Sequence, residues 1–145
     1  MARFLQEADY SPRIAAEIKR MVTGTTDEVS GKQLIAEETA IALITEYIGG
    51  RKDCAIIFTA WDGTGTDTRN AWIVKCVITL ALYDLYHQTG VRDIPEHRQT
   101  EYDTVISWLK DVGRGNINSS LPDLPEEQNP GDFRLNSRPP VNHKW

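Results

Sequence analysis

The chain has 145 residues, a formal net charge of −5 and 40% hydrophobic residues. That length is enough for one domain and too short for two of ordinary size. The acidic balance argues against affinity driven by phosphate contacts, and four Trp, five Tyr and three Phe argue against a wholly disordered chain.

Two helices are predicted in the first 50 residues. The first begins at Asp9 or Ser11, with Ser11-Pro12 as its cap, and runs to about Val22. The second spans about 28–48, and its apolar stripe consists of Leu34, Ile41, Ile44 and Ile48. Glu37 is expected off that stripe. Gly49-Gly50 is expected to end the helix, because glycine tolerates the left-handed conformation of a C-cap.

Two further helices follow an irregular stretch over 51–69. Within that stretch, Cys54–Phe58 predicts either a short extended segment or one helical turn, and 61–67 predicts a polar loop. The third helix spans about 70–88 with Asp67 or Thr68 as its cap. It is apolar almost all round, so we expect it at the centre of the domain. The fourth spans about 95–112 and ends at Gly113 and Gly115. The fold class expected is all-α, a small four-helix bundle.

The last 30 residues differ from the rest, because they hold five of the seven prolines and show no helical or strand period. We therefore divide the chain into a helical domain, 1–115, and an extended C-terminal arm, 116–145, which orders on a partner. Phe133, Arg134, Leu135 and Trp145 are its candidate partner-binding residues, since aromatic residues and arginine anchor interfaces. We expect the bundle to fold without the arm but to lose its attachment.

A search for catalytic and cofactor motifs indicates no enzyme, no cofactor and no metal. The Asp62–Asp67 stretch resembles a calcium loop only weakly, since threonines occupy two ligand positions and Ile73 stands where a Glu is required. The three histidines have no zinc spacing, and Cys76 lies within an apolar helix as a packing thiol. Reduced cysteines are expected, with a disulfide to Cys54 as the less favoured alternative.

Charges and hydropathy indicate two further features. Lys75 and Asp84 interrupt the third helix, and each must reach solvent or find a partner, because an unpaired buried charge is costly. Structural pairing is favoured, with Arg69 or Arg98 as the partner of Asp84, and a contact with another subunit is the alternative. The most apolar window, 71–86, is shorter than the roughly 20 residues of a membrane span, and the chain starts without an apolar signal-like run. No membrane association is expected.

Several short motifs occur along the chain in this order: Phe4-Leu5-x-x-x-Asp9-Tyr10, Tyr47-x-x-Gly50-Arg51-x-Asp53-Cys54, Ile57-Phe58, Arg69-Asn70, Ile78-Thr79-Leu80-x-Leu82-Tyr83-x-Leu85, Ile94-Pro95-x-x-Arg98, Tyr102-Asp103-x-x-Ile106-x-Trp108-Leu109-x-x-Val112-x-x-Gly115 and Leu121-Pro122. Taken together, they resemble the Mu-like family of tailed-phage neck proteins. The resemblance covers about 4–122. Many relatives carry a tyrosine where this chain has Lys52.

This resemblance implies a non-enzymatic head–tail connector, also called a head-completion adaptor. Such proteins form an oligomeric ring, often a dodecamer, beneath the portal protein of the capsid, and they prepare it for the tail or stopper protein. DNA passes through the channel without specific binding, which agrees with the acidic charge. The expected location is the neck of the virion, after assembly in the cytoplasm of the host bacterium.

The loop residues Trp61, Asp62, Thr64 and Asp67 are candidates for facing the ring lumen or a neighbouring subunit. Two other hypotheses remain open. One is a free oligomeric helical binding or regulatory module, which would form dimers or tetramers and no ring. The other is a small metal-dependent enzyme that uses the Asp62–Asp67 loop, which metal-dependent thermal stabilisation would support.

Overall fold

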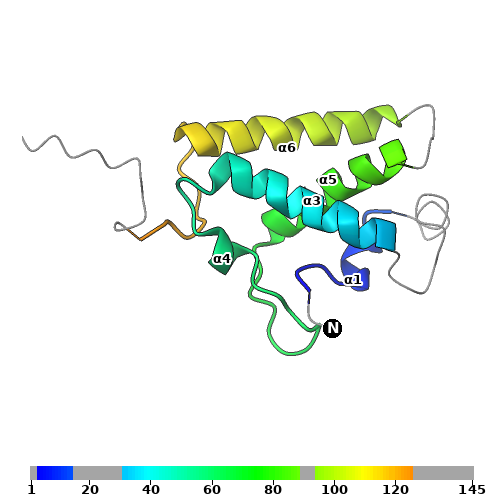
Figure 1. Cartoon of the computed structure of the whole chain (residues 1–145), viewed down its shortest axis with the longest axis horizontal. Coiled ribbons are helices and arrows are strands. Elements are labelled where there is room, and N and C mark those ends of the chain that lie inside the picture. The colour runs from blue at the N-terminus through cyan, green and yellow to red at the C-terminus, as the bar shows by residue number, and fades with distance from the viewer. Residues whose placement is uncertain (1–2, 15–30, 89–93, 126–145) are drawn as a thin grey trace, which may run out of the picture.

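The computed structural model describes residues 3–14, 31–88 and 94–125 (Figure 1). These residues form five helices and no strand, apart from two isolated β-bridges. The helices are α1 (Glu7–Tyr10), α3 (Gly31–Ile48), α4 (Cys54–Ile57), α5 (Ala71–Gln88) and α6 (Glu96–Arg114). The all-α prediction is therefore confirmed.

The three long helices build the core. Helices α3, α5 and α6 all pack against one another, and α5 runs antiparallel to the other two (Figure 1). Eleven of its 18 residues are buried, among them Ile73, Val77 and Leu82. The expectation that this helix is central is confirmed, because a helix apolar all round needs cover on several sides.

One predicted helix start, that of the first helix, and one predicted cap, that of the third, are wrong. Ser11 follows α1 as its C-cap, and the capping box at the start of that short helix is formed by Gln6 with Asp9. The rest of the helix predicted to reach Val22 lies outside the described residues. At the start of α5, Asn70 Oδ1 accepts hydrogen bonds from the backbone of Trp72 (3.0 Å) and Ile73 (3.1 Å), so Asn70, not Asp67 or Thr68, caps the helix.

The glycines act differently from the prediction. Helix α3 ends at Ile48 as expected, but neither Gly49 nor Gly50 has a positive φ. Gly113 does not end α6. It lies inside the helix, where an added Cβ would be 2.4 Å from the carbonyl oxygen of Tyr47, and Gly115 with φ 78° forms the C-cap. Gly113 thus permits close approach of α3 and α6.

The buried face of α3 is rotated relative to the predicted stripe in its first two turns. Leu34 is 39% exposed, whereas Gln33 and Glu37 are buried and Ile44 and Ile48 complete the inner face. The prediction that Glu37 lies off the buried face is therefore wrong. Its burial has a specific cause, because the N-terminal segment supplies an arginine and a tyrosine to its carboxylate.

The first ten residues of the predicted arm pack on the helical domain. Leu121 is buried, and the segment runs antiparallel to residues 51–53 through two backbone hydrogen bonds, Asp53 N to Pro122 O (2.9 Å) and Leu124 N to Arg51 O (3.2 Å). In Figure 1 this segment descends from the end of α6, past the end of α3, towards α4. Phe133, Arg134, Leu135 and Trp145 lie outside the described residues.

Candidate functional site

The polar loop 59–69 leaves α4, projects from the helices beside the N-terminal segment and returns to α5 (Figure 1). Its tip is exposed, including three of the four predicted site residues, Asp62, Thr64 and Asp67. Trp61 is half-buried. Positive φ angles at Gly63 (85°) and Gly65 (72°) turn the chain at the tip, which glycine adopts without strain.

Hydrogen bonds within the tip connect three of the predicted residues. Asp62 Oδ1 accepts from the backbone N–H (2.9 Å) and hydroxyl (2.8 Å) of Thr64. These bonds lower the pKa of Asp62 below its usual value. The Trp61 indole donates to the carbonyl of Thr64 at 2.8 Å. The loop therefore uses these groups to hold its own shape.

Asp67 points elsewhere, towards Arg69. The Arg69 guanidinium binds Asp67 at 2.8 Å and Asp9 at 2.7 Å, and it donates to the carbonyl of Phe4 at 2.7 Å. It also lies over the Trp61 ring, 4.4 Å from the centroid. The hydrogen bond with Arg69 lowers the pKa of Asp67, and the bonds to Asp67 and Asp9 raise that of Arg69. Arg69 thus fastens the loop to the N-terminal segment.

A second polar cluster attaches the N-terminal segment to α3. Arg3 Nη1 lies 2.7 Å from both Glu37 carboxylate oxygens, and the Tyr10 hydroxyl donates to Glu37 at 2.6 Å. Gln33 donates to Glu37 at 3.3 Å and to Glu7 at 2.9 Å. Burial, followed by the Glu37 charge, raises the pKa of Tyr10 well above its usual range.

Backbone contacts complete this attachment. Trp61 N donates to Arg3 O at 3.1 Å, and the Gln6 amide donates to the carbonyl of Trp61. The beginning of the chain, the loop and α3 are therefore held together as one unit. Sequence reasoning missed Glu37, Gln6 and the role of Arg69.

A third cluster holds residues 119–123 against the domain. The Lys52 ammonium, 6% exposed as a whole residue, donates to the carbonyls of Ser119 and Leu121 at 3.3 Å each and pairs with Asp123 at 2.5 Å. Two acceptors and a carboxylate offset the cost of burying the lysine charge. No sequence signal indicated this role.

The expected ion pair of Asp84 is wrong. Asp84 accepts a hydrogen bond from Gln88, one turn later. Arg69 is committed to Asp9 and Asp67, while Arg98 pairs with Glu101 and donates to the carbonyl of Arg13 at 3.0 Å. Because Asp84 is half-exposed, it needs no buried cation.

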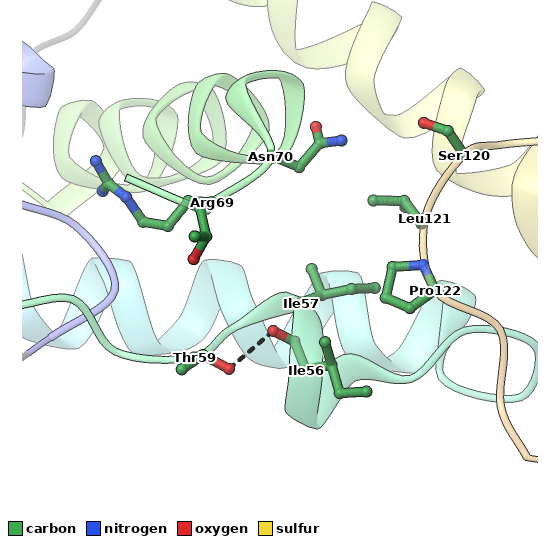
Figure 2. Close-up of a pocket in the computed structure, with 9 residues that line it drawn as sticks. Ile56, Ile57, Thr59, Arg69, Asn70, Ser120, Leu121 and Pro122 are labelled. Atoms are coloured by element: carbon green, nitrogen blue, oxygen red, sulfur yellow. Dashed lines mark hydrogen bonds between the residues drawn. The ribbon is translucent and has the colours of Figure 1, made fainter. Parts of the chain in front are cut away.

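A pocket of about 370 Å³ lies between α4, the start of α5 and the 120–122 segment (Figure 2). Its lining residues are Ile56, Ile57, Thr59, Thr68, Arg69, Asn70, Ser120, Leu121 and Pro122. In Figure 2 Ile57 and Leu121 point into the space between their elements, and the Thr59 hydroxyl bonds back to the Ile56 carbonyl at 2.9 Å. Ile56 is 60% exposed at the rim of the pocket.

The described part of the chain shows no group of three or more His, Cys, Asp or Glu side chains that would hold a metal ion. Both cysteines are free, and burial raises the pKa of Cys76 to about 12. Among the described helices, none has the length and apolar character that crossing a membrane requires.

The three polar clusters hold segments of the chain together around the helical core. The protein is therefore a small all-α module. Its sequence matches the family described as Bacteriophage Mu, Gp36 over residues 6–136, so the chain belongs to that family. It is accordingly a structural or morphogenesis protein of a phage. No curated protein and no solved structure matches the chain.

Several motifs behind the family resemblance meet in three dimensions. Asp9 of the first motif pairs with Arg69 of another, and Arg51 Nε donates to the carbonyl of Gly113 at 2.9 Å. Asp53 caps α4 by accepting from Ile56 N at 3.3 Å. Residues of these motifs therefore form contacts between segments that are distant in sequence. The presence of Arg69 in one of the motifs was the sequence feature that could have indicated its role.

Proposed function

We propose that this protein is a head–tail connector that forms a ring beneath the portal and joins the capsid to the tail. The observation that carries the proposal is the extent of the family match. It continues beyond the helical domain to residue 136 and includes Phe133-Arg134-Leu135. The match therefore covers the first part of the arm, 116–136, as well as the helices, which supports a role for that part in fastening one virion protein to another.

The fold supplies features that suit such a role. The polar loop projects from the bundle on a rigid base held by Arg69, and the exposed Ile56 lies at a different place on the surface. In a cyclic ring, each interface joins one surface of a copy to a different surface of its neighbour. The polar loop and the surface around Ile56 are candidates for these two surfaces. The loop residues Trp61, Asp62, Thr64 and Asp67 would then face a neighbour or the lumen.

Shortening the arm tests its part in the proposal. The chain is shortened to residues 1–125. A longer deletion that also removed residues 116–125 would remove the buried Leu121 and the carbonyls that accept hydrogen bonds from Lys52. We expect the 1–125 chain to keep the helical circular-dichroism spectrum of the full chain and to lose co-sedimentation with the cognate portal protein. A 1–125 chain that binds the portal as well as the full chain does would contradict the role of the arm.

The full chain in the same experiment tests the connector function itself. Co-sedimentation with the portal and rings in electron micrographs would support it. Dimers or tetramers that do not bind the portal would instead favour a free oligomeric helical binding or regulatory module.

A further inference from the structure

The polar loop keeps a defined conformation although none of its residues 59–68 is buried. Nine of these ten residues are exposed, and Trp61 is half-buried. Ordering the backbone of each residue costs conformational entropy, and burial of apolar surface offsets little of that cost in this loop. Polar contacts at the base of the loop must therefore hold its shape, and they are concentrated on Arg69.

The Arg69 guanidinium uses all five of its N–H donors. Nη1 donates to the Phe4 carbonyl and to Asp9 Oδ2, both at 2.7 Å, and Nη2 donates to Asp9 Oδ1 at 3.1 Å. Nη2 and Nε also donate to the two carboxylate oxygens of Asp67, at 2.8 and 2.9 Å. The side chain is 4% exposed, and in Figure 2 it extends away from Leu121 on the far wall of the pocket. A lysine ammonium has three donors and cannot reproduce this planar arrangement.

A second set of contacts reaches the loop from the same segment. The Gln6 amide donates to the Trp61 carbonyl, and the Trp61 N–H donates to the Arg3 carbonyl at 3.1 Å. The Gln6 side chain also lies beside Gly63, where an added Cβ would be 3.7 Å from Gln6 Oε1. Both sets of contacts come from residues 3–9, so the conformation of the loop depends on the N-terminal segment.

A loop held in this way has the character of a pre-organised contact element. It loses little conformational entropy when it binds, so its affinity for a partner is higher than that of a mobile loop. A channel wall that lets DNA slide past needs no such fixed shape, and the exposed carboxylate of Asp62 repels phosphate groups. A protein surface is therefore the partner that the loop fits.

We propose that Arg69 is a positioning residue, which fixes the polar loop in the conformation in which the loop contacts a second copy of this chain. The inference rests on the proposed ring, in which each copy presents one surface to one neighbour and a different surface to the next. The loop supplies one of these two surfaces. Arg69 acts on it through the Asp67 carboxylate and the Trp61 ring.

Arg69→Lys in the full-length chain tests the positioning role. The lysine keeps the charge but loses part of the hydrogen bonding, so hydrogen exchange at the amides of Trp61 and Thr64 should accelerate while exchange in α5 stays slow. In analytical ultracentrifugation, the dissociation constant of self-association is expected to rise about tenfold, which corresponds to about 1.4 kcal/mol.

The matched control is Arg98→Lys, the same substitution at another buried arginine. Arg98 is 8% exposed and bonds to Glu101 and to the carbonyl of Arg13. This variant is expected to lower the free energy of unfolding without raising the dissociation constant. Equal effects of the two arginine variants on self-association would overturn the proposal.

Gln6→Ala provides a second variant if Arg69→Lys does not fold. Gln6 lies outside the loop, so its substitution acts on self-association through the position of Trp61. The dissociation constant is expected to rise, as in Arg69→Lys. The control is Gln88→Ala, which removes an exposed amide bonded to Asp84. Self-association equal to that of the control would overturn the positioning role.

Photo-crosslinking identifies the partner of the loop. The light-activated residue p-benzoylphenylalanine replaces the exposed Thr66, and this chain is mixed with wild-type chain labelled uniformly with ¹⁵N. Trypsin cuts after Lys52 and Arg69, so the loop lies in peptide 53–69. The expected product joins the unlabelled loop peptide to a ¹⁵N-labelled peptide, and its yield should fall when Arg69→Lys is added. Crosslinks only within one copy, or none in a chain that forms rings, would overturn the proposal.

Portal co-sedimentation of the same proteins separates this proposal from the connector function. Wild-type rings that bind the portal, but whose loop does not crosslink to a second copy, contradict only the role of the loop. A wild-type chain that stays monomeric and does not bind the portal contradicts both.

Discussion

Glu37 shows how a charged residue can occupy a buried position of a helix. It was expected off the apolar stripe of α3 because it is charged, but its spacing, three residues after Leu34 and four before Ile41, places it on that face. It is 5% exposed and receives Arg3 and Tyr10 from 27 or more residues away. Helical periodicity depends only on residues of one helix, so it does not predict a binding partner from a distant segment of the chain. Burial of this carboxyl group is tolerated because Arg3 and Tyr10 both bind it.

Replacing Glu37 tests this interpretation. Glu37→Ala leaves the Arg3 charge and the Tyr10 hydroxyl without their acceptor and is expected to lower the free energy of unfolding by about 3 kcal/mol. Urea denaturation followed by circular dichroism measures the loss. The control is Glu38→Ala, an exposed neighbour expected to change the value by about 0.5 kcal/mol or less. Equal stability of the two variants would contradict the role of the cluster.

Tyr10 should make the protein sensitive to alkali. Its pKa is raised above the ordinary value of 10.0 by burial and by Glu37, so the folded state holds the phenolic proton more tightly than the unfolded state. Its contribution is therefore complete below about pH 10 and is lost progressively as the pH rises above that value. Urea midpoints measured from pH 8 to 11 should fall less steeply for Tyr10→Phe. Parallel curves for the two proteins would contradict this.

At the scale of elements, sequence pattern predicted what depends on local chemistry. The central helix was predicted to start at residue 70 and starts at Ala71, because its long apolar run is a local signal. Gly115, one of the two glycines predicted to end α6, is its C-cap. The pattern failed where two elements meet. Gly113 resembles a helix end in sequence, whereas its function is to accommodate the Tyr47 carbonyl of α3.

The contact between α3 and α6 can be tested at Gly113. In a helix interior alanine is favoured over glycine by about 1 kcal/mol, but the added methyl would press on a backbone oxygen, which costs about 1–3 kcal/mol. The second effect is expected to dominate, so Gly113→Ala should lower the midpoint of thermal unfolding. Gly50→Ala, where an added Cβ meets nothing within 4 Å, serves as the control. A more stable Gly113→Ala would contradict the close approach.

The cluster around Lys52 holds the start of the arm against the helical domain. Lys52→Ala removes three bonds from residues 119–123, so hydrogen exchange at the amides of Asp53 and Leu124 should accelerate at least tenfold. Asp123→Ala is expected to do less, because Asp123 is exposed and the two carbonyls remain. Unchanged exchange at both amides in Lys52→Ala would show that the backbone pairing holds the segment alone.

At the scale of the whole molecule, sequence predicted the fold class and the family, and the structure adds how the segments are joined. The polar loop was predicted as a surface feature, but its base could not be, because Asp9 and Arg69 are 60 residues apart. Contacts over such separations depend on tertiary packing.

The central claim is that this chain is a connector between the capsid and the tail. Electron cryomicroscopy of the intact phage particle, with this chain identified in the density, tests it most directly. The account predicts a ring of copies directly beneath the portal, each contacting the portal on one side and a tail-side protein on the other. Particles in which the neck density is built entirely from other proteins would contradict it.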